Sequence, residues 1–151
     1  MRRTIGWAVL AVAAFPPLVP GAVAATKPGP LAVDAIEVEP PAPSPGTLCK
    51  LRVRIRNTAE QDATNLVFAV RIGGAEMTVY RNHVWMTRVA AGTTATVELH
   101  NFWVPDASPR TVEVALSEAR WMKLTTEGET SVTTVLGPVD GLPSTLTRDL
   151  K

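Results

Sequence analysis

The feature that most restricts the fold of this chain is the strict alternation of side chains between Leu48 and Asn57. Every second residue is apolar, namely Cys49, Leu51, Val53 and Ile55. The residues between them are basic, namely Lys50, Arg52, Arg54 and Arg56. A period of two places these two sets on opposite faces of an extended strand, whereas a helix would mix them around its circumference. The segment is therefore predicted to be a strand with one face in the core and one face in solvent.

The rest of the chain after residue 30 shows weaker forms of the same pattern, separated by turn residues. Further strand-like runs are Leu31–Glu39, Leu66–Ile72, Ala75–Tyr80, Ala95–Trp103, Val112–Leu116 and Thr130–Leu136. Gly73 and Gly74 suit a two-residue hairpin turn because both tolerate positive φ. We expect a polar loop at 57–65 and one short helical turn at Ser117–Lys123. About seven to eight short strands with turn signals between them predict an all-β fold of antiparallel sheets packed as a sandwich.

The two ends of the chain are expected to lie outside this sandwich. Residues 1–25 have a short basic start, an apolar run and a small-residue end, as a secretory signal peptide does. An uncleaved membrane anchor is the alternative, although the apolar run is short for a span of roughly 20 residues. We expect a tether at 26–30, the domain at 31–136 and an irregular tail at 137–151. The leader predicts an exported protein, periplasmic or extracellular.

Composition limits the partners and the means of stabilising the domain. The chain has 151 residues, a formal net charge of +1 and one cysteine, Cys49. Near neutrality leaves no electrostatic footprint for nucleic acid or for an anionic membrane. A lone thiol in an oxidising compartment is expected to be buried, and a disulfide-linked dimer through Cys49 is the alternative. The oligomeric state stays open at this point.

The order of the strand and turn motifs resembles that of the bacterial CARDB and related immunoglobulin-like extracellular modules. The segments that carry the resemblance are Ile36–Pro40, Pro45–Gly46, Leu51–Ala59, Asn65–Phe68 and Ala91–Val97. In those modules an opening strand leads to a Pro-Gly turn, and the next strand alternates and ends in Asn-x-Gly or Asn-x-Ala. The resemblance covers residues 31–136 and implies an immunoglobulin-like sandwich with an adhesive or scaffolding role and no catalytic residues. It fails at Glu118–Lys123, where those modules often carry an acidic, asparagine-rich segment, so no ligand role is carried over there.

The sequence contains no pattern typical of catalysis. A nucleophilic Ser or Cys needs a base that a third group orients, and the chain has two histidines and no Gly-x-Ser-x-Gly elbow. It also has no glycine loop that would cradle a phosphate and no zinc-protease helix motif. We therefore expect a non-enzymatic protein that uses no cofactor.

A periplasmic copper-handling protein is an alternative, because histidine and methionine are ligands that copper favours. The candidate ligands are His83, Met86 and His100. However, His83 and Met86 are an odd number of residues apart, so one strand cannot point both to the same face. The competing interpretation is that the histidines lie on the surface and that the methionines fill gaps in the core.

The aromatic residues of the second half are the candidates for contact with a partner. They are Tyr80, Trp85, Phe102, Trp103 and Trp121. Phe102 shares the alternation phase of Glu98 and His100 and is expected to be exposed, whereas one tryptophan is expected in the core. Exposed aromatics mark surfaces that bind proteins or sugars, and core packing is the competing interpretation. We expect an accessory or structural subunit that binds another protein of a cell-envelope or secreted assembly, with a carbohydrate-binding module as the further alternative.

Overall fold

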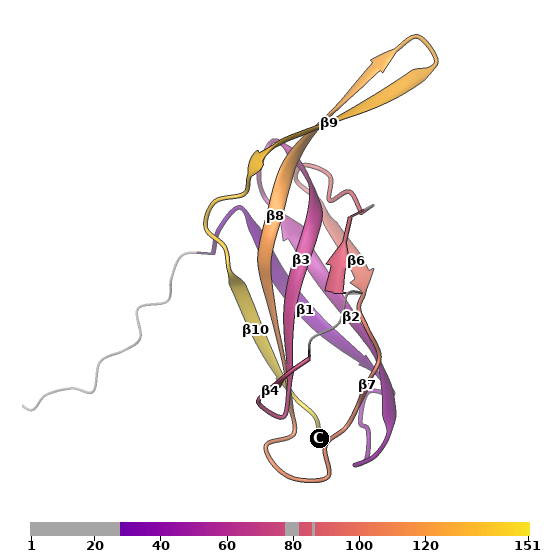
Figure 1. The fold of residues 1–151 in the computed structure, drawn as a ribbon, viewed down its shortest axis with the longest axis vertical. Helices are drawn as coiled ribbons and strands as arrows, with labels where there is room; N and C mark the ends of the chain where they lie inside the picture. Colours follow the sequence, from indigo (N-terminus) through magenta and orange to yellow (C-terminus); the bar gives the residue numbers. More distant parts are fainter. Residues whose placement is uncertain (1–27, 78–81, 86) are drawn as a thin grey trace, which may run out of the picture.

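The computed structural model describes residues 28–77, 82–85 and 87–151 and consists of antiparallel β-strands (Figure 1). The strands are β1 (Leu31–Glu39), β2 (Leu48–Asn57), β3 (Asp62–Ile72), β4 (Ala75–Glu76), β5 (His83–Val84), β6 (Thr94–Glu98), β7 (Phe102–Trp103), β8 (Thr111–Glu127), β9 (Thr130–Pro138) and β10 (Ser144–Asp149). Within the described ranges no helix is long and apolar enough to cross a membrane. The predicted leader, 1–25, and residues 26 and 27 of the predicted tether lie outside the described residues.

The strands form two sheets that pack face to face around one core, as in a β-sandwich. The smaller sheet has the order β1-β2-β6, and β7 pairs with the beginning of β2. The larger sheet has the order β10-β8-β3-β4, with β5 beside β3 and β9 beside β8. The chain crosses between the sheets from β2 to β3, from β5 to β6 and from β7 to β8. This arrangement confirms the prediction of antiparallel sheets in two layers.

The alternating strand β2 is half-buried, as its sequence predicts. The four apolar side chains at its alternating positions, Cys49, Leu51, Val53 and Ile55, are fully buried in the core. Its basic side chains lie on the outer face, where the acidic side chains of β1 and β6 neutralise them. Arg54 Nε lies 2.8 Å from a carboxylate oxygen of Asp34, and Arg52 lies 3.4 Å from both Glu39 and Glu98. The basic side chains of β2 are therefore paired with carboxylates of the same sheet and do not form a free anion-binding surface.

The Asn57–Ala59 motif at the end of β2 has a structural role. The side chain of Asn57 is buried, and its amide donates hydrogen bonds to the carbonyl oxygens of Gln61 and Val89 at 2.8 and 3.0 Å. Its side-chain oxygen accepts a hydrogen bond from the backbone N–H of Ala59 at 3.0 Å. One side chain thus joins three backbone segments, which explains why a strand end of this kind uses asparagine.

Two expectations about local structure are wrong in the middle of the chain. The loop after β2 is shorter than expected, because β3 already begins at Asp62. Ser117–Lys123 contains no helical turn, because β8 runs as one strand from Thr111 to Glu127. Its pairing with β3 shifts register between Thr64 and Phe68, and such irregularities interrupt the two-residue alternation that marks a strand. The sequence pattern therefore hides the continuity of β8.

The expectation of an irregular tail at 137–151 is also wrong. Residues 144–149 form β10, which pairs with β8 over its whole length, and Leu150 after it is buried. The Oγ of Ser144 accepts a hydrogen bond from the N–H of Val33 at 3.0 Å. Arg148 donates hydrogen bonds to the carbonyl oxygens of Ile36 and Pro41 at 2.9 and 3.1 Å. The side chains of β10 thus close the gap between the two sheets along β1, and we call this contact the β1–β10 seam.

The second half of β8 leaves the sandwich together with β9. Beyond Met122, β8 pairs with β9 alone, and the two strands form a hairpin that projects past the end of both sheets (Figure 1). We call this hairpin, residues 123–136, the β8–β9 arm. Its side chains are exposed or half-exposed, including Leu124, Val132 and Val135.

Candidate binding surface at Trp85

The aromatic residues predicted to contact a partner differ in their exposure to solvent. Trp85 and Trp103 are 67% and 64% exposed, whereas Phe102 is only 3% exposed. Trp121 is half-buried and packs against the core. Tyr80 lies outside the described residues. Among the described residues no tryptophan is fully buried, so the expectation of a tryptophan in the core is wrong. Trp121 comes nearest to that role.

The expectation that Phe102 is exposed is wrong because the alternation does not continue from β6 to β7. β6 ends at Glu98, and residues 99–101 belong to neither strand. β7 then pairs with the beginning of β2, where Phe102 lies opposite the buried Cys49. Cross-strand partners share a face of the sheet, so Phe102 points into the core and Trp103 points to solvent.

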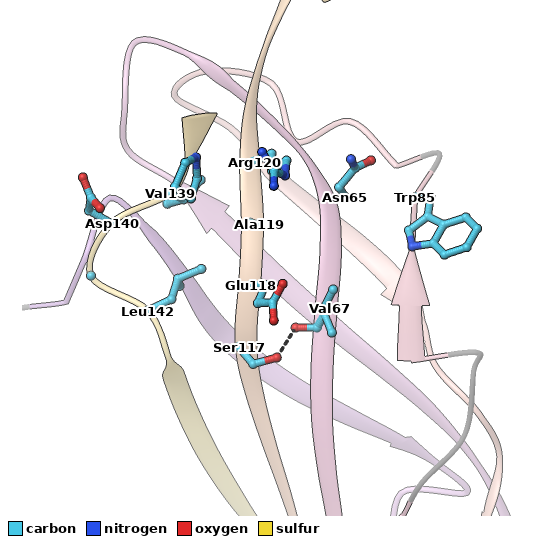
Figure 2. A pocket seen from close by; sticks show the side chains of 12 residues that line it. Asn65, Val67, Trp85, Ser117, Glu118, Ala119, Arg120, Val139, Asp140 and Leu142 are labelled. Atoms are coloured by element: carbon cyan, nitrogen blue, oxygen red, sulfur yellow. Dashed lines mark hydrogen bonds between the residues drawn. The ribbon is translucent and has the colours of Figure 1, made fainter. Parts of the chain in front are cut away.

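Trp85 lies at the rim of a depression on the larger sheet (Figure 2). The depression has a volume of about 380 Å³. Its floor is formed by β3 and β8, and the segment 138–142 that leads to β10 forms the opposite wall. The polar residues that line it are Asn65, Ser117, Glu118, Arg120 and Asp140. Of the residues predicted to contact a partner, Trp85 is the one found at this depression.

Irregular pairing between β3 and β8 shapes the floor. Asn65 adopts a φ of 53°, a left-handed conformation that asparagine tolerates better than most residues. The register of β3 and β8 shifts between Thr64 and Val67, directly around this residue. Ser117 Oγ donates a hydrogen bond to the carbonyl oxygen of Val67 at 3.0 Å and so joins β8 to β3 where their register shifts (Figure 2). β-bulges of this kind bend a strand and redirect its side chains.

Two contacts position Trp85, one with β3 and one with the neighbouring β5. The hydroxyl of Thr64 donates a hydrogen bond to the carbonyl oxygen of Trp85 at 3.1 Å. The rings of His83 and Trp85 meet edge to face, with their centroids 6.3 Å apart. These contacts position the Trp85 backbone while leaving most of the indole in solvent. An indole held in this way offers a large apolar surface at a low cost in conformational entropy.

The chemistry of the depression suits recognition. It combines one exposed aromatic ring with two carboxylates, of Glu118 and Asp140, the guanidinium of Arg120 and the amide of Asn65. The Arg120 guanidinium also donates a hydrogen bond to the carbonyl oxygen of Leu136 at 3.5 Å, which ties it to the base of the arm. Sequence analysis missed these four polar residues, because they come from three distant segments that no local pattern connects.

The residues of the copper alternative do not form a site among the described residues. No group of three or more His, Cys, Asp or Glu side chains that could hold a metal is found in residues 28–77, 82–85 and 87–151. His83 contacts Trp85, and the Nδ1 of His100 lies 2.7 Å from the carbonyl oxygen of Asn101. Met86 lies outside the described residues. Cys49 is fully buried, as predicted, and burial raises the pKa of its thiol, which disfavours the thiolate that would bind a metal.

Comparison with known proteins adds no relative. No protein-family model matches the chain, no curated protein matches it, and no solved structure matches its fold.

Proposed function

We propose that this chain is an exported, non-enzymatic binding module of the immunoglobulin-like class that recognises a protein of a cell-envelope or secreted assembly through the Trp85 surface. The proposed export rests on the leader-like residues 1–25. The observation that carries the proposed binding role is the exposed indole of Trp85 at the rim of a depression with hydrogen-bonding side chains.

The strand order supports the immunoglobulin-like class. In such domains the first, second and fifth strands share one sheet, and the third, sixth and seventh share the other. The neighbours in the smaller sheet, β1-β2-β6, match the first group, and the neighbours β10-β8-β3 match the second, while β9 is an additional strand that pairs only with β8. The resemblance to CARDB-like modules implies the same class of fold, and it also implies an adhesive role.

A protein partner accounts for the Trp85 surface better than the alternatives do. Tryptophan and arginine are the residues most enriched at energetically important positions of protein interfaces, and both are present in this depression. A carbohydrate-binding module remains the second candidate, because a single indole beside carboxylate and amide groups can also stack on a sugar ring. However, Trp103 lies on β7 in the other sheet, so the two exposed indoles do not form one flat platform.

The test uses the full-length chain, tagged and exported in its producing cells, as wild type, Trp85→Ala and Trp103→Ala. The two tryptophans are almost equally exposed, so Trp103→Ala is the matched control. We expect a stoichiometric protein partner in the wild-type and Trp103→Ala pull-downs, and its loss by about 10-fold or more with Trp85→Ala. Equal recovery with all three chains would remove Trp85 from the interface. An empty pull-down, together with a change in tryptophan fluorescence on addition of oligosaccharides, would favour the sugar-binding alternative.

A further inference from the structure

In the described part of the chain, the outer edge of β9 is the longest strand edge that neither pairs with a strand nor is covered by other side chains. β9 pairs with β8 on one side, and no other strand pairs with it. From Thr130 to Val135 every residue is exposed. Its backbone N–H and C=O groups on the outer side are therefore available to another strand, which is the situation that leads to edge-to-edge association.

Between Thr130 and Gly137 the sequence of β9 carries none of the usual protection of a free edge, and its one proline, Pro138, is its last residue. Natural edge strands are blunted by charged side chains, by proline, by bulges or by short length. Residues 130–137 read Thr-Ser-Val-Thr-Thr-Val-Leu-Gly, without a charge or a proline. The one shift in the β8–β9 register lies between Arg120 and Met122, at the base of the arm. Among the other described edge strands, β1 is covered by β10 side chains, β4, β5 and β7 are two residues long, and β6 is five residues long and ends in the charged Glu98.

The β8–β9 arm also lacks the packing that normally stabilises a hairpin. Two isolated strands are marginally stable in water, and three or more strands are usually needed. The arm projects beyond both sheets (Figure 1). Both of its faces expose apolar side chains. Val135 and Leu124 lie on the face shared with Met122, and Val132 lies on the opposite face. A further pair of strands beside the arm would supply what it lacks.

We propose that β9 pairs with β9 of a second copy of this chain, antiparallel, so that two arms form one four-stranded ribbon. In an antiparallel pair about a two-fold axis, each residue of β9 in one copy lies opposite a residue of β9 in the other copy. In β9 this brings Thr and Val side chains opposite one another and never places like charges together, which is the favourable case for cross-strand pairs. Because the arm extends past the end of both sheets (Figure 1), the proposed contact lies outside the two sandwiches.

A second copy of this chain is a better partner for the outer edge of β9 than a strand of another protein is. An unprotected edge is a hazard to a chain that stays alone, and self-pairing removes that hazard whenever the protein is concentrated. It also needs no charged or bulky side chain on β9 to select a partner, and none is present. The proposal is independent of the Trp85 surface, which lies on another part of the larger sheet, and it uses no disulfide because Cys49 is buried.

The test measures the mass of the full-length purified chain in solution by analytical ultracentrifugation over a range of concentrations. We expect a concentration-dependent shift from the monomer to twice its mass. The variant Thr133→Lys/Thr134→Lys places two positive charges on each copy at the centre of β9, one on each face, and is expected to remain monomeric. The variant Thr133→Glu/Thr134→Glu is expected to remain monomeric for the same reason. An equimolar mixture of the two is expected to regain the doubled mass, because opposite charges then face one another.

The matched control is Thr145→Lys/Thr147→Lys, which adds the same charge to exposed positions of β10, whose outer side lies along β1. It is expected to dimerise like the wild type, and the far-ultraviolet circular dichroism of all variants should be that of the wild type. A wild-type chain that stays monomeric at the highest soluble concentration would overturn the proposal. A dimer that survives the double Lys substitution would also overturn it, and so would a mixture of Lys and Glu variants that stays monomeric. None of these outcomes depends on Trp85, so failure here is distinguishable from failure of the proposed function.

Discussion

The larger sheet ends differently at the β1–β10 seam and at the β8–β9 arm. At the seam, the hydroxyl of Ser144 and the guanidinium of Arg148 satisfy backbone groups of β1, and Leu150 closes the core beneath them. At the arm, two strands satisfy one another and leave their outer edges and both faces in solvent. The comparison shows that strand pairing alone does not determine how much a strand contributes to the free energy of unfolding, because the side chains around the strand decide whether it is part of the core.

The largest effect is expected at the seam. Arg148→Ala removes hydrogen bonds to the carbonyl oxygens of Ile36 and Pro41 and the packing of the arginine stem. We expect the free energy of unfolding to fall by about 2–3 kcal/mol, because hydrogen bonds to charged groups are worth more than neutral ones. Chemical denaturation monitored by circular dichroism measures it. Arg71→Ala is the control, since the Arg71–Glu113 pair is exposed and should cost less than about 0.5 kcal/mol. Equal losses in the two variants would contradict the role of the seam.

A smaller, pH-dependent effect is expected at the base of the arm, where Asp62 on β3 lies opposite Met122. The backbone N–H of Ala91 donates a hydrogen bond to the Asp62 carboxylate and is the main cause that lowers its pKa, and Arg88 lowers it further although burial opposes both. A depressed pKa in the folded state means that the carboxylate adds stability above its unfolded pKa of about 4, and that this stability is lost as pH falls through the folded value.

Asp62→Asn should therefore reduce stability at pH 7 by about 1–2 kcal/mol. The difference from the wild type should shrink steadily below about pH 4. Denaturation curves collected from pH 2 to pH 7 measure both chains, and Glu76→Gln is the control because Glu76 is exposed. A difference between wild type and Asp62→Asn that does not change with pH would show that the carboxylate charge is not the cause.

The smallest effect on stability is expected from shortening the arm itself. Lys123 and Thr134 are directly opposite in the ladder, so residues 124–133 can be replaced by an Asn-Gly turn. At a concentration where the wild type is monomeric, we expect the free energy of unfolding to change by less than about 1 kcal/mol, because the arm buries little apolar surface. The same chain should lose dimer formation. A large loss of stability in the monomer would mean that the arm belongs to the folding unit of the sandwich.

Sequence analysis predicted the first two long strands to the residue, since β1 and β2 have the bounds expected from their patterns. It failed at β8 and β10 for different reasons. In β8 the register shifts near Val67 break the alternation, so a strand of 17 residues resembled a strand followed by a helical turn. In β10 the preceding Pro138, Gly141 and Pro143 suggested an irregular tail, yet the six residues after them alternate between half-buried and exposed.

The candidate site could be predicted only in part. Trp85 was among the predicted contact residues, but its sequence neighbourhood does not distinguish it from Phe102 or Trp103. Exposure depends on which strand lies opposite, and Phe102 is buried because β7 pairs with the beginning of β2. The polar lining of the depression depends on the approach of residues 138–142 to β8, which is a long-range contact.

By itself, the sequence determined an all-β chain with half-buried strands, a buried Cys49 and a turn at Gly73 and Gly74. These properties follow from the local alternation of side chains and from backbone conformations that glycine permits. Only the tertiary structure decided which aromatic residues are exposed, where the depression lies, which edge of the sandwich is closed and that the β8–β9 arm projects from it. Those properties depend on pairing between strands that are far apart in the chain, and a period of two is the same whichever strand lies alongside.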